Sequence, residues 1–249
     1  MGNIKADDLL SPIYAHDEIE AITKAARKRK RPFVLSLSPG PAPVENIKHL
    51  QSVAQLWRIS EDFWDDWEAL KEQFPLCRKW QKYICKGHWP DADMLPIGPM
   101  AQRAMRGTPR MSNFTPDEQY TMLTLWAMFR SPLMIGCNLP EIDDFTLNLI
   151  TNKEVLDINQ YSKGNKELFD RNGIIAWYAQ SEDELTHYIA IFNTTDKDIE
   201  SYTFPLQTIN YIGDGHITDL WKNESMEIKN NSVSFSVPAH GVKLIKLTK

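Results

Sequence analysis

The segment Gln55-Leu-Trp-Arg-Ile-Ser-Glu-Asp-Phe-Trp-Asp-Asp-Trp67 organises the predicted structure of this chain. It begins as a short apolar run typical of a buried strand, passes through a carboxylate-rich turn, and continues into a sequence typical of a helix. Arg58 and Asp62 are expected at the carboxyl end of that strand, where barrel enzymes carry their catalytic groups. The tryptophans offer faces on which sugar rings can stack, and the arginine and acids offer partners for hydroxyls.

The composition of the 249-residue chain allows one large domain or two smaller ones. Its formal net charge of -5 argues against a general binder of nucleic-acid phosphates. The basic run Arg27–Arg31 is interpreted as the solvated end of a helix, where the helix dipole favours positive charge. No apolar run reaches the ~18 residues of a membrane span. We therefore predict no nucleic-acid partner and no membrane span, and the sequence does not give the oligomeric state.

Strand-like and helix-like segments alternate through residues 1–161, which predicts an α/β domain with a parallel sheet. Asp65 and Asp66 are expected in the first turn of the third helix, where negative charge is favoured. The expected strands are residues 3–6, Phe33–Ser36, Leu56–Ile59 and Leu133–Ile135, with a strand end or loop at His88–Leu95 and a long loop at 96–113. The expected helices are His16–Lys30, Val44–Ala54, Asp62–Tyr83, Thr115–Arg130 and, as the last one, Ile142–Thr151.

The pattern changes near Ser162, and short alternating strands separated by turn signals continue to Lys249. Asn172-Gly173 and Asn230-Asn231 are such signals. We therefore predict a domain boundary, with residues 1–161 forming the α/β domain and residues 162–249 an antiparallel β-sandwich. The expected strands are Ile174–Tyr178, Tyr188–Phe192, Ser201–Phe204, Ile217–Trp221, Ser232–Val237 and Val242–Leu247.

Lys5 and Asp7 form the first candidate pair of functional residues. They are two residues apart, so on a strand their side chains face the same side. A lysine beside a carboxylate keeps that carboxylate ionised, as a nucleophile requires. The alternative is a helix-capping aspartate with a surface lysine, a common arrangement.

Asp91 and Asp93 form a second candidate site. Their spacing could hold a divalent metal, but no histidine or further acidic partner stands nearby in the sequence. Binding of sugar hydroxyls is the better functional interpretation, because a carboxylate can accept hydrogen bonds from two adjacent hydroxyls. The structural alternative for Asp91 is a turn residue after Pro90.

Four places, in the order of the chain, resemble glycoside hydrolase family 27, the α-galactosidases or melibiases. Lys5-Ala-Asp7 resembles the Lys-x-Asp of the family's fourth barrel strand. Trp57-Arg58, followed by Asp62 and Trp67, resembles its sixth-strand motif. Trp89-Pro-Asp-Ala-Asp93-Met-Leu resembles Trp-x-Asp-Pro-Asp-Met-Leu, and Pro238-Ala-His-Gly-Val-Lys-Leu244 resembles the closing strand of the family's C-terminal β-domain.

The resemblance implies that the chain carries about strands four to eight of a (β/α)8 barrel, followed by the sandwich. It also implies a retaining mechanism by double displacement, in which the two catalytic carboxyl groups lie about 5–5.5 Å apart. Asp7 is then the catalytic nucleophile, and Asp62 is the catalytic acid/base, which we expect to be buried among the tryptophans. The implied substrate-binding residues are Lys5, Ser38, Arg58, Asp93 and Met94, with an α-galactoside-type carbohydrate as substrate and no metal or organic cofactor required.

The chain also departs from the family pattern. The first three barrel strands have no counterpart, so we expect a fragment with exposed sheet edges that does not turn over substrate alone. The stretch Ser36–Pro41 matches the family's specificity loop: its serine resembles the α-N-acetylgalactosaminidases, but its prolines fit neither group. The terminal sugar therefore stays open between galactose, N-acetylgalactosamine and β-L-arabinopyranose. Asp8-Leu9 stands where eukaryotic members have a disulfide cysteine, which indicates a bacterial enzyme.

Two other classes of function remain as alternatives. The first is a carbohydrate-binding protein that kept the fold and lost the chemistry. The second is an unrelated acidic α/β enzyme, for instance a metal-dependent one. Both carboxylate positions of the family pattern are filled, by Asp7 and Asp62, so the sequence favours the glycosidase.

Overall fold

The structure is a computed structural model that describes residues 2–28, 33–103 and 107–249. Residues 29–31 of the basic run therefore lie outside the described residues. By compactness the chain divides into two units: one comprises Met1–Trp64, Glu68–Met94 and Ser131–Ile135, and the other Asp65–Trp67, Leu95–Arg130 and Gly136–Lys249. In the part of the chain that is described, no helix has the length and apolar character needed to cross a lipid bilayer.

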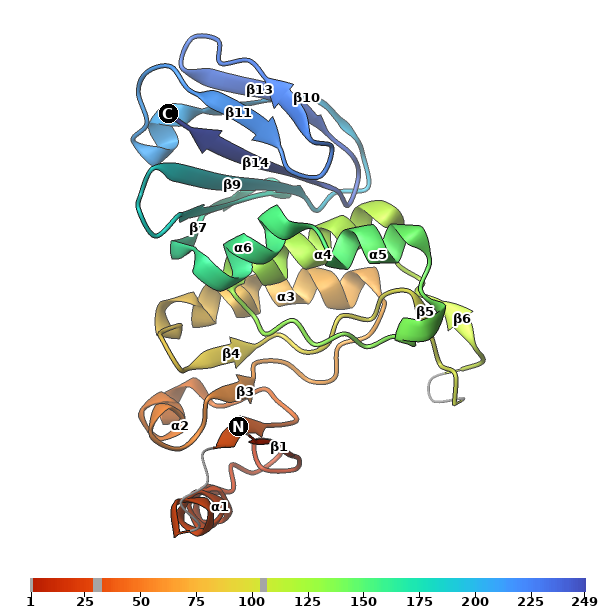
Figure 1. Cartoon of the computed structure of the whole chain (residues 1–249), viewed down its shortest axis with the longest axis vertical. Coiled ribbons are helices and arrows are strands. Elements are labelled where there is room, and N and C mark those ends of the chain that lie inside the picture. The colour runs from red at the N-terminus through yellow and green to blue at the C-terminus, as the bar shows by residue number, and fades with distance from the viewer. Residues whose placement is uncertain (1, 29–32, 104–106) are drawn as a thin grey trace. The chain divides into compact units, whose positions relative to one another are not determined.

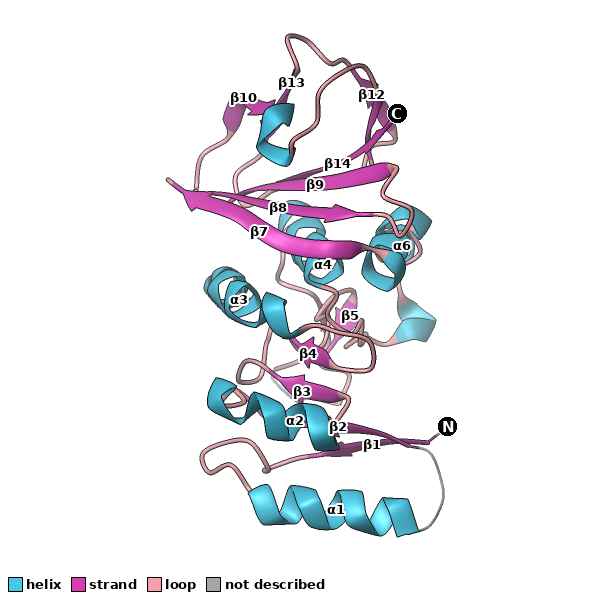
Figure 2. Ribbon diagram, turned by 90° about the vertical axis from the view of Figure 1, so that its left-hand side faces the viewer, coloured by secondary structure: helices cyan, strands magenta, loops and turns pink. Residues whose placement is uncertain are grey.

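The first unit is a four-stranded parallel sheet whose strands alternate with helices (Figures 1 and 2). Its strand order, β1-β2-β3-β4, is also the order of the chain, as expected for successive right-handed crossovers. The strands are β1 (Gly2–Ala6), β2 (Phe33–Leu37), β3 (Leu56–Arg58) and β4 (Trp89–Asp91). The helices are α1 (His16–Lys28), α2 (Ile47–Val53) and α3 (Trp67–Trp80), with 3-10 turns η1 (Val44–Asn46) and η2 (Gln81–Tyr83).

Burial follows the position of each strand in this sheet. Residues 35–37 of β2 are buried without alternation, as in a parallel sheet covered on both faces. β1 has β2 as its neighbour in the ladder and is largely exposed, with Ile4 44% exposed. β1 is thus an open edge strand of the unit, in agreement with the exposed edge predicted from the sequence.

The second unit is built around a β-sandwich. A six-stranded sheet of order β12-β11-β14-β9-β8-β7 faces a two-stranded sheet of β10 and β13. The strands are β7 (Lys163–Arg171), β8 (Ile174–Gln180), β9 (Thr186–Asn193), β10 (Ile199–Pro205), β11 (His216–Asp219), β12 (Glu224–Met226), β13 (Ser232–Val237) and β14 (Val242–Thr248). The unit also contains α4 (Pro116–Phe129), α5 (Asp144–Ile150), α6 (Lys153–Tyr161), η3 (Leu139–Glu141), η4 (Leu206–Ile209) and the pair β5 (Pro99–Met100) and β6 (Arg110–Met111).

Both faces of the six-stranded sheet are covered. Alternate residues such as Ile189 and Ile191 of β9 enter the core between the two sheets. On the opposite face α4 contacts β7, β8, β9 and β14, and Phe129 packs edge-to-face on Trp177. This explains why α4 is apolar around most of its circumference. Met122, Leu125, Trp126 and Phe129 of this helix are all fully buried.

The predicted α/β class followed by an antiparallel sandwich is confirmed, and so are most of its elements. The helix expected from Thr115 forms as α4, and Thr115 caps it through a capping box with Glu118. Asn172, Gly173, Asn230 and Asn231 all have positive φ, as tight hairpin turns between twisted strands require.

Several expected elements are wrong in detail. The third helix begins at Trp67, so Asp62, Asp65 and Asp66 precede it instead of opening it. Residues 133–135 are all described and form no strand, apart from an isolated bridge at Ile135. Helix α6 and strands β7 and β12 were not expected, and α6 follows the helix predicted to be the last. Compactness groups α4–α6 with the sandwich, so the domain boundary between residues 161 and 162 stays a prediction.

Candidate active site

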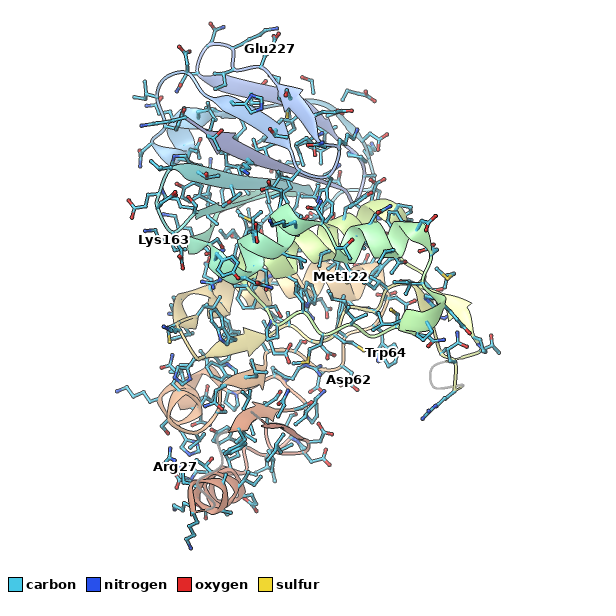
Figure 3. The ribbon with its side chains drawn as sticks, viewed as in Figure 1. Arg27, Asp62, Trp64, Met122, Lys163 and Glu227 are labelled. Atoms are coloured by element: carbon cyan, nitrogen blue, oxygen red, sulfur yellow. The ribbon has the colours of Figure 1, made fainter. Side chains whose placement is uncertain are left out.

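The carboxyl edge of the parallel sheet brings most of the candidate residues together. Ala6, Leu37, Trp57 and Pro90 lie in one row across the four strands. The residues that come next in the chain are Asp7 after Ala6, Ser38 after Leu37, Arg58 after Trp57 and Asp91 after Pro90. These four follow one another along the same edge. Figure 3 shows Asp62 and Trp64 at the side toward which β3 and β4 point in Figure 1. Because β1 and β3 both neighbour β2, their backbones are about 10 Å apart, two strand spacings.

Arg58 is the buried centre of this edge, with a side chain 1% exposed. Its Nη2 donates to Asp93 Oδ2 at 2.7 Å and to the carbonyl oxygen of Glu61 at 2.6 Å. The same nitrogen lies 3.5 Å from Oδ1 of Asp62, a longer contact through a single oxygen. Arg58 therefore orients the loop that carries Asp62 and does not form a bidentate pair with Asp62.

Asp93 holds the same loop from the other side. Its Oδ2 accepts the backbone N–H of Phe63 at 2.8 Å, and its own N–H donates to Oδ1 of Asp91 at 2.9 Å. Its backbone is left-handed, with φ at 81°. Peptide groups on both sides of Asp62 are thus fixed, one through Glu61 and one through Phe63. We call the set of Arg58, Asp91 and Asp93 the loop clamp.

The Asp62 carboxylate projects from the clamped loop, and its side chain is 60% exposed. The expected burial of Asp62 among tryptophans is therefore wrong. Trp57 is fully buried and belongs to the core of its unit, so it offers no face to a sugar. Trp67 belongs to the second unit, where its ring stacks on His240 with centroids 4.0 Å apart.

Asp91 carries the burial that we expected at Asp62. It is 1% exposed, and this desolvation raises the pKa of its carboxyl to about 6. The hydrogen bond from the Asp93 N–H and the charges of Arg58 and Lys5 act in the opposite direction, while the charge of Asp93 adds to the rise. The sequence placed Asp91 in a candidate site with Asp93, with a turn residue as the structural alternative, but it did not indicate that Asp91 is the buried acid. Its position two residues before Asp93, at a strand's carboxyl end, was the signal available.

Lys5 and Asp7 are both exposed, and no ion pair joins them among the described residues. The contact by which Lys5 was expected to keep Asp7 ionised is therefore not formed. Lys5 instead lies within electrostatic reach of Asp91. Asp7 follows the last residue of β1, and the left-handed Asp8, with φ at 60°, turns the chain away directly after it.

Ser38 is buried at the end of β2, where its N–H donates to the carbonyl of Ala6 at 2.9 Å. The loop after it packs tightly on β3, because a Cβ on Gly40 would lie 2.4 Å from the carbonyl oxygen of Ser60. Ala42 donates its N–H to the carbonyl of Arg58 at 2.9 Å. The proline-rich loop is thus fixed against the strand that carries the clamp. Met94 follows Asp93 and is half-buried.

Asp65 has a different role from the helix-opening one expected. It is buried and accepts the backbone N–H of Asn113 at 2.6 Å. Both of its oxygens bind the guanidinium of Arg110, which raises the pKa of Arg110. Asp65 therefore anchors the loop that leads into α4. No feature of the sequence indicated this partner.

The described residues contain no group of three or more His, Cys, Asp or Glu side chains arranged to hold a metal ion. The Asp91–Asp93 pair, considered as a metal site from its spacing, is instead occupied by Arg58 and backbone N–H groups. What the carboxyl edge offers chemically is one buried cation, Arg58, two buried acids, Asp91 and Asp93, and two exposed carboxylates, Asp7 and Asp62. Asp7 and Asp62 follow strands β1 and β3, which share β2 as a neighbour.

Comparison with known families gives two matches that together cover most of the chain. Residues 13–161 match the family described as "Alpha galactosidase A". Residues 172–247 match the "Alpha galactosidase C-terminal beta sandwich domain".

Among curated proteins, the chain is 24% identical over 200 residues to an alpha-galactosidase of Cyamopsis tetragonoloba, covering 80% of this chain and 46% of that protein. It is 26% identical over 231 residues to alpha-galactosidase A of Cellvibrio japonicus, covering 80% of this chain and 51% of that protein. The chain thus spans about half the length of the curated relatives it matches.

Among solved structures, a GH27 β-L-arabinopyranosidase of Geobacillus stearothermophilus is 39% identical, with a TM-score of 0.94, over 100% of this chain and 58% of that one. A putative alpha-N-acetylgalactosaminidase of Bacillus halodurans is 33% identical, with a TM-score of 0.85, over 100% of this chain and 59% of that one.

Proposed function

Because this chain belongs to the alpha-galactosidase family of glycoside hydrolases, family 27, we propose that it supplies both catalytic carboxylates of a retaining glycosidase for terminal α-galactosyl residues. Asp7 is the proposed nucleophile and Asp62 the proposed acid/base. In the motifs quoted above, the positions of Asp7 and Asp62 resemble the family's catalytic positions.

The loop clamp is the observation that carries this proposal. An acid/base must be held in place yet reach the substrate, and Asp62 has a fixed backbone with an exposed carboxylate. A purely structural aspartate at this position would not need two buried partners to fix the peptides on either side of it. Asp7 lies at the same sheet edge, directly after β1, and β2 separates β1 from the strand that leads into the clamped loop.

The proposed reaction has two steps. In the first, Asp7 attacks the anomeric carbon, the bond to the leaving oxygen breaks, and Asp62 gives its proton to that oxygen. In the second, a water molecule gives a proton to Asp62 while its oxygen attacks the anomeric carbon and releases Asp7. Two inversions restore the original configuration, so the product has the anomeric form of the substrate.

The choice of terminal sugar has a specific second candidate, a β-L-arabinopyranoside. The solved structure that is 39% identical to this chain is described as a β-L-arabinopyranosidase. This sugar differs from galactose by lacking the exocyclic hydroxymethyl group. An α-N-acetylgalactosaminide is a further candidate, because a putative enzyme of that type is 33% identical. Ser38, at the end of β2, is the proposed specificity residue.

A substrate panel with product stereochemistry tests the proposal. Aryl α-D-galactoside, β-L-arabinopyranoside and α-N-acetylgalactosaminide are compared by kcat/KM, and the first-formed anomer is read by NMR. Because the chain spans about half of its relatives, the assay uses both the chain alone and a chimera preceded by the N-terminal part of the Geobacillus enzyme. Retained configuration on one substrate supports the proposal. Inverted product contradicts the mechanism, and binding without turnover in both proteins supports a non-catalytic carbohydrate-binding protein.

A further inference from the structure

A cavity lies within the unit that contains the sandwich and takes no part in the proposed chemistry. It opens between α6 and the hairpin that joins β8 to β9, and its volume is about 650 Å³. That volume is within the ~300–1,000 Å³ of small-ligand sites. Lys153, Asp157 and Tyr161 line one wall, Glu182 and Asp183 line the other, and Tyr188 of β9 lines it from the sheet.

The α6 wall presents one stripe of side chains, since Lys153, Asp157 and Tyr161 are four residues apart. Its last turn is fixed by Arg130, which donates to the carbonyl oxygens of Asn159 and Gln160 at 2.9 and 2.7 Å. Tyr161 directly follows, with 54% of its surface exposed. A large aromatic ring is therefore held at the cavity rim without being covered.

The hairpin wall is also ordered by hydrogen bonds. Ser181 and Thr186 pair through the backbone, and Asp183 accepts the Leu185 N–H at 3.1 Å. Lys163 ties the hairpin to the start of β7 through Glu184 at 2.7 Å. Both walls are thus formed before a ligand arrives, which lowers the entropic cost of binding.

Tyr188 is the observation that points to a ligand. The residue is 7% exposed, and its neighbours Ile189 and Ile191 mark the opposite face of β9 as the one that enters the sandwich core. Tyr188 lines the cavity, and its side chain forms no hydrogen bond to any described residue. Burial and the charges of Glu154, Asp157 and Asp183 raise the pKa of Tyr188, so the hydroxyl remains a donor. This accessible hydroxyl on a largely buried side chain is available to a ligand in the cavity.

We propose that this cavity is a non-catalytic binding site for a neutral saccharide. The donors and acceptors that it presents are mixed. Lys153 and Tyr188 offer unused N–H and O–H donors, while Asp157 and Glu182 offer carboxylates with no hydrogen bond or ion pair to the described residues. A sugar hydroxyl both donates and accepts, so a sugar can satisfy all four, and the ring of Tyr161 can pack on its apolar face.

Other ligand classes match this set less well. An anion would face the carboxylates of Asp157, Glu182 and Asp183. A simple cation would leave the donors of Lys153 and Tyr188 unpaired. The inference does not depend on the proposed catalysis, because none of the cavity residues belongs to the carboxyl edge of the parallel sheet.

The test is a binding titration of the 249-residue chain with melibiose, lactose and maltose, followed by calorimetry and by saturation-transfer NMR. The background is Asp7→Asn, which removes the proposed nucleophile and prevents turnover. Tyr188→Phe removes only the hydroxyl, and its matched control is Tyr202→Phe, on β10 of the other sheet. Asp157→Asn is matched by Asp214→Asn, an exposed aspartate outside the cavity. Circular dichroism melting verifies that each variant folds.

We expect saturable binding of at least one disaccharide, weakened about 3- to 10-fold by Tyr188→Phe, the loss of one hydrogen bond. Asp157→Asn should weaken it by a similar or larger factor, and Tyr161→Ala by about tenfold or more. Both controls should leave the affinity unchanged. Failure of all three sugars to bind overturns the proposal. So does an affinity that the cavity variants do not change, or tighter binding of tetramethylammonium than of any of the sugars.

The two proposals fail separately. In the chimera, Tyr188→Phe should leave hydrolysis of a small aryl glycoside unchanged. Asp7→Asn should abolish hydrolysis without changing disaccharide binding at the cavity. A loss of hydrolysis in Tyr188→Phe would contradict the non-catalytic assignment of the cavity.

Discussion

The buried side chain of Arg58 donates a hydrogen bond to the carboxylate of Asp93 at 2.7 Å. The same two side chains also bind the peptide groups on either side of Asp62. A buried ion pair by itself is weak evidence for stability, because desolvation of the two charges offsets their attraction. Here the pair has a geometric consequence that a surface pair lacks. The candidate acid/base is exposed, yet its backbone cannot move without breaking a buried hydrogen bond.

Asp93→Asn tests the clamp as a structural unit. The substitution removes the negative charge of Asp93. The buried guanidinium of Arg58 then loses the carboxylate oxygen, Oδ2 of Asp93, to which it donates. We expect the free energy of unfolding to fall by about 3–5 kcal/mol, as for other broken buried pairs. Urea denaturation measures it, with the fully exposed Asp17→Asn as control. A loss no larger than that of the control would show that the pair does not hold the loop.

Asp91→Asn tests the raised pKa of the buried acid. The pKa of Asp91 in the folded protein, about 6, lies above the usual aspartate value of 3.8, so the folded protein binds the proton more tightly than the unfolded chain does. Protonation of Asp91 therefore stabilises the folded protein. This stabilisation is complete below the pKa of Asp91 in the unfolded chain and is lost as the pH rises through its pKa in the folded protein. Between pH 5 and pH 8 this contributes a fall of about 1 kcal/mol in stability. The asparagine variant should lose this part of the pH dependence, and identical pH profiles of unfolding would contradict the assignment.

Gly40→Ala tests the packing of the proline-rich loop on β3. An added Cβ would meet backbone atoms of Ser60 and Arg58 at 2.4 to 2.9 Å, and backbone cannot rotate out of the way as a side chain can. We expect a loss of about 1–3 kcal/mol in the free energy of unfolding. Gly2→Ala is the matched control, since nothing lies within 4 Å of its added Cβ. Equal stabilities of the two variants would mean that the loop relaxes freely.

Asp62→Asn tests the proton-transfer role in the chimera. Poor leaving groups need a proton in the first step, and activated aryl leaving groups do not. We expect kcat/KM to fall by about 100-fold or more on a disaccharide and far less on a dinitrophenyl glycoside. Initial rates on the two substrates measure the difference. Equal losses on both would exclude Asp62 as the acid.

Local signals predicted most of the fold well. The turn pairs Asn172-Gly173 and Asn230-Asn231 specify left-handed conformations, and the cap at Thr115 specifies a helix start. Each depends on the residues in the turn or cap itself. The start of α3 was misplaced because Asp62, Asp65 and Asp66 suit a first helical turn, whereas tertiary partners hold Asp62's loop and Asp65 in other conformations.

The candidate site was only partly predictable for the same reason. Strand-end positions and motif spacing indicated Asp7, Arg58, Asp62 and Asp93. Sequence spacing does not specify which carboxylate is buried, so burial was assigned to Asp62 when it belongs to Asp91. The pairing of Asp93 with Phe63 and of Asp65 with Arg110 joins segments far apart in the chain, and no local pattern encodes either contact.

Trapping the glycosyl-enzyme tests the proposed roles most directly. The chimera is incubated with a mechanism-based fluoroglycoside of its preferred sugar and digested, and the labelled peptide is sequenced by mass spectrometry. The account predicts one added glycosyl unit, attached to Asp7 and absent from the Asp7→Asn variant. A label on another carboxylate, or full turnover with no trapped intermediate, would contradict it.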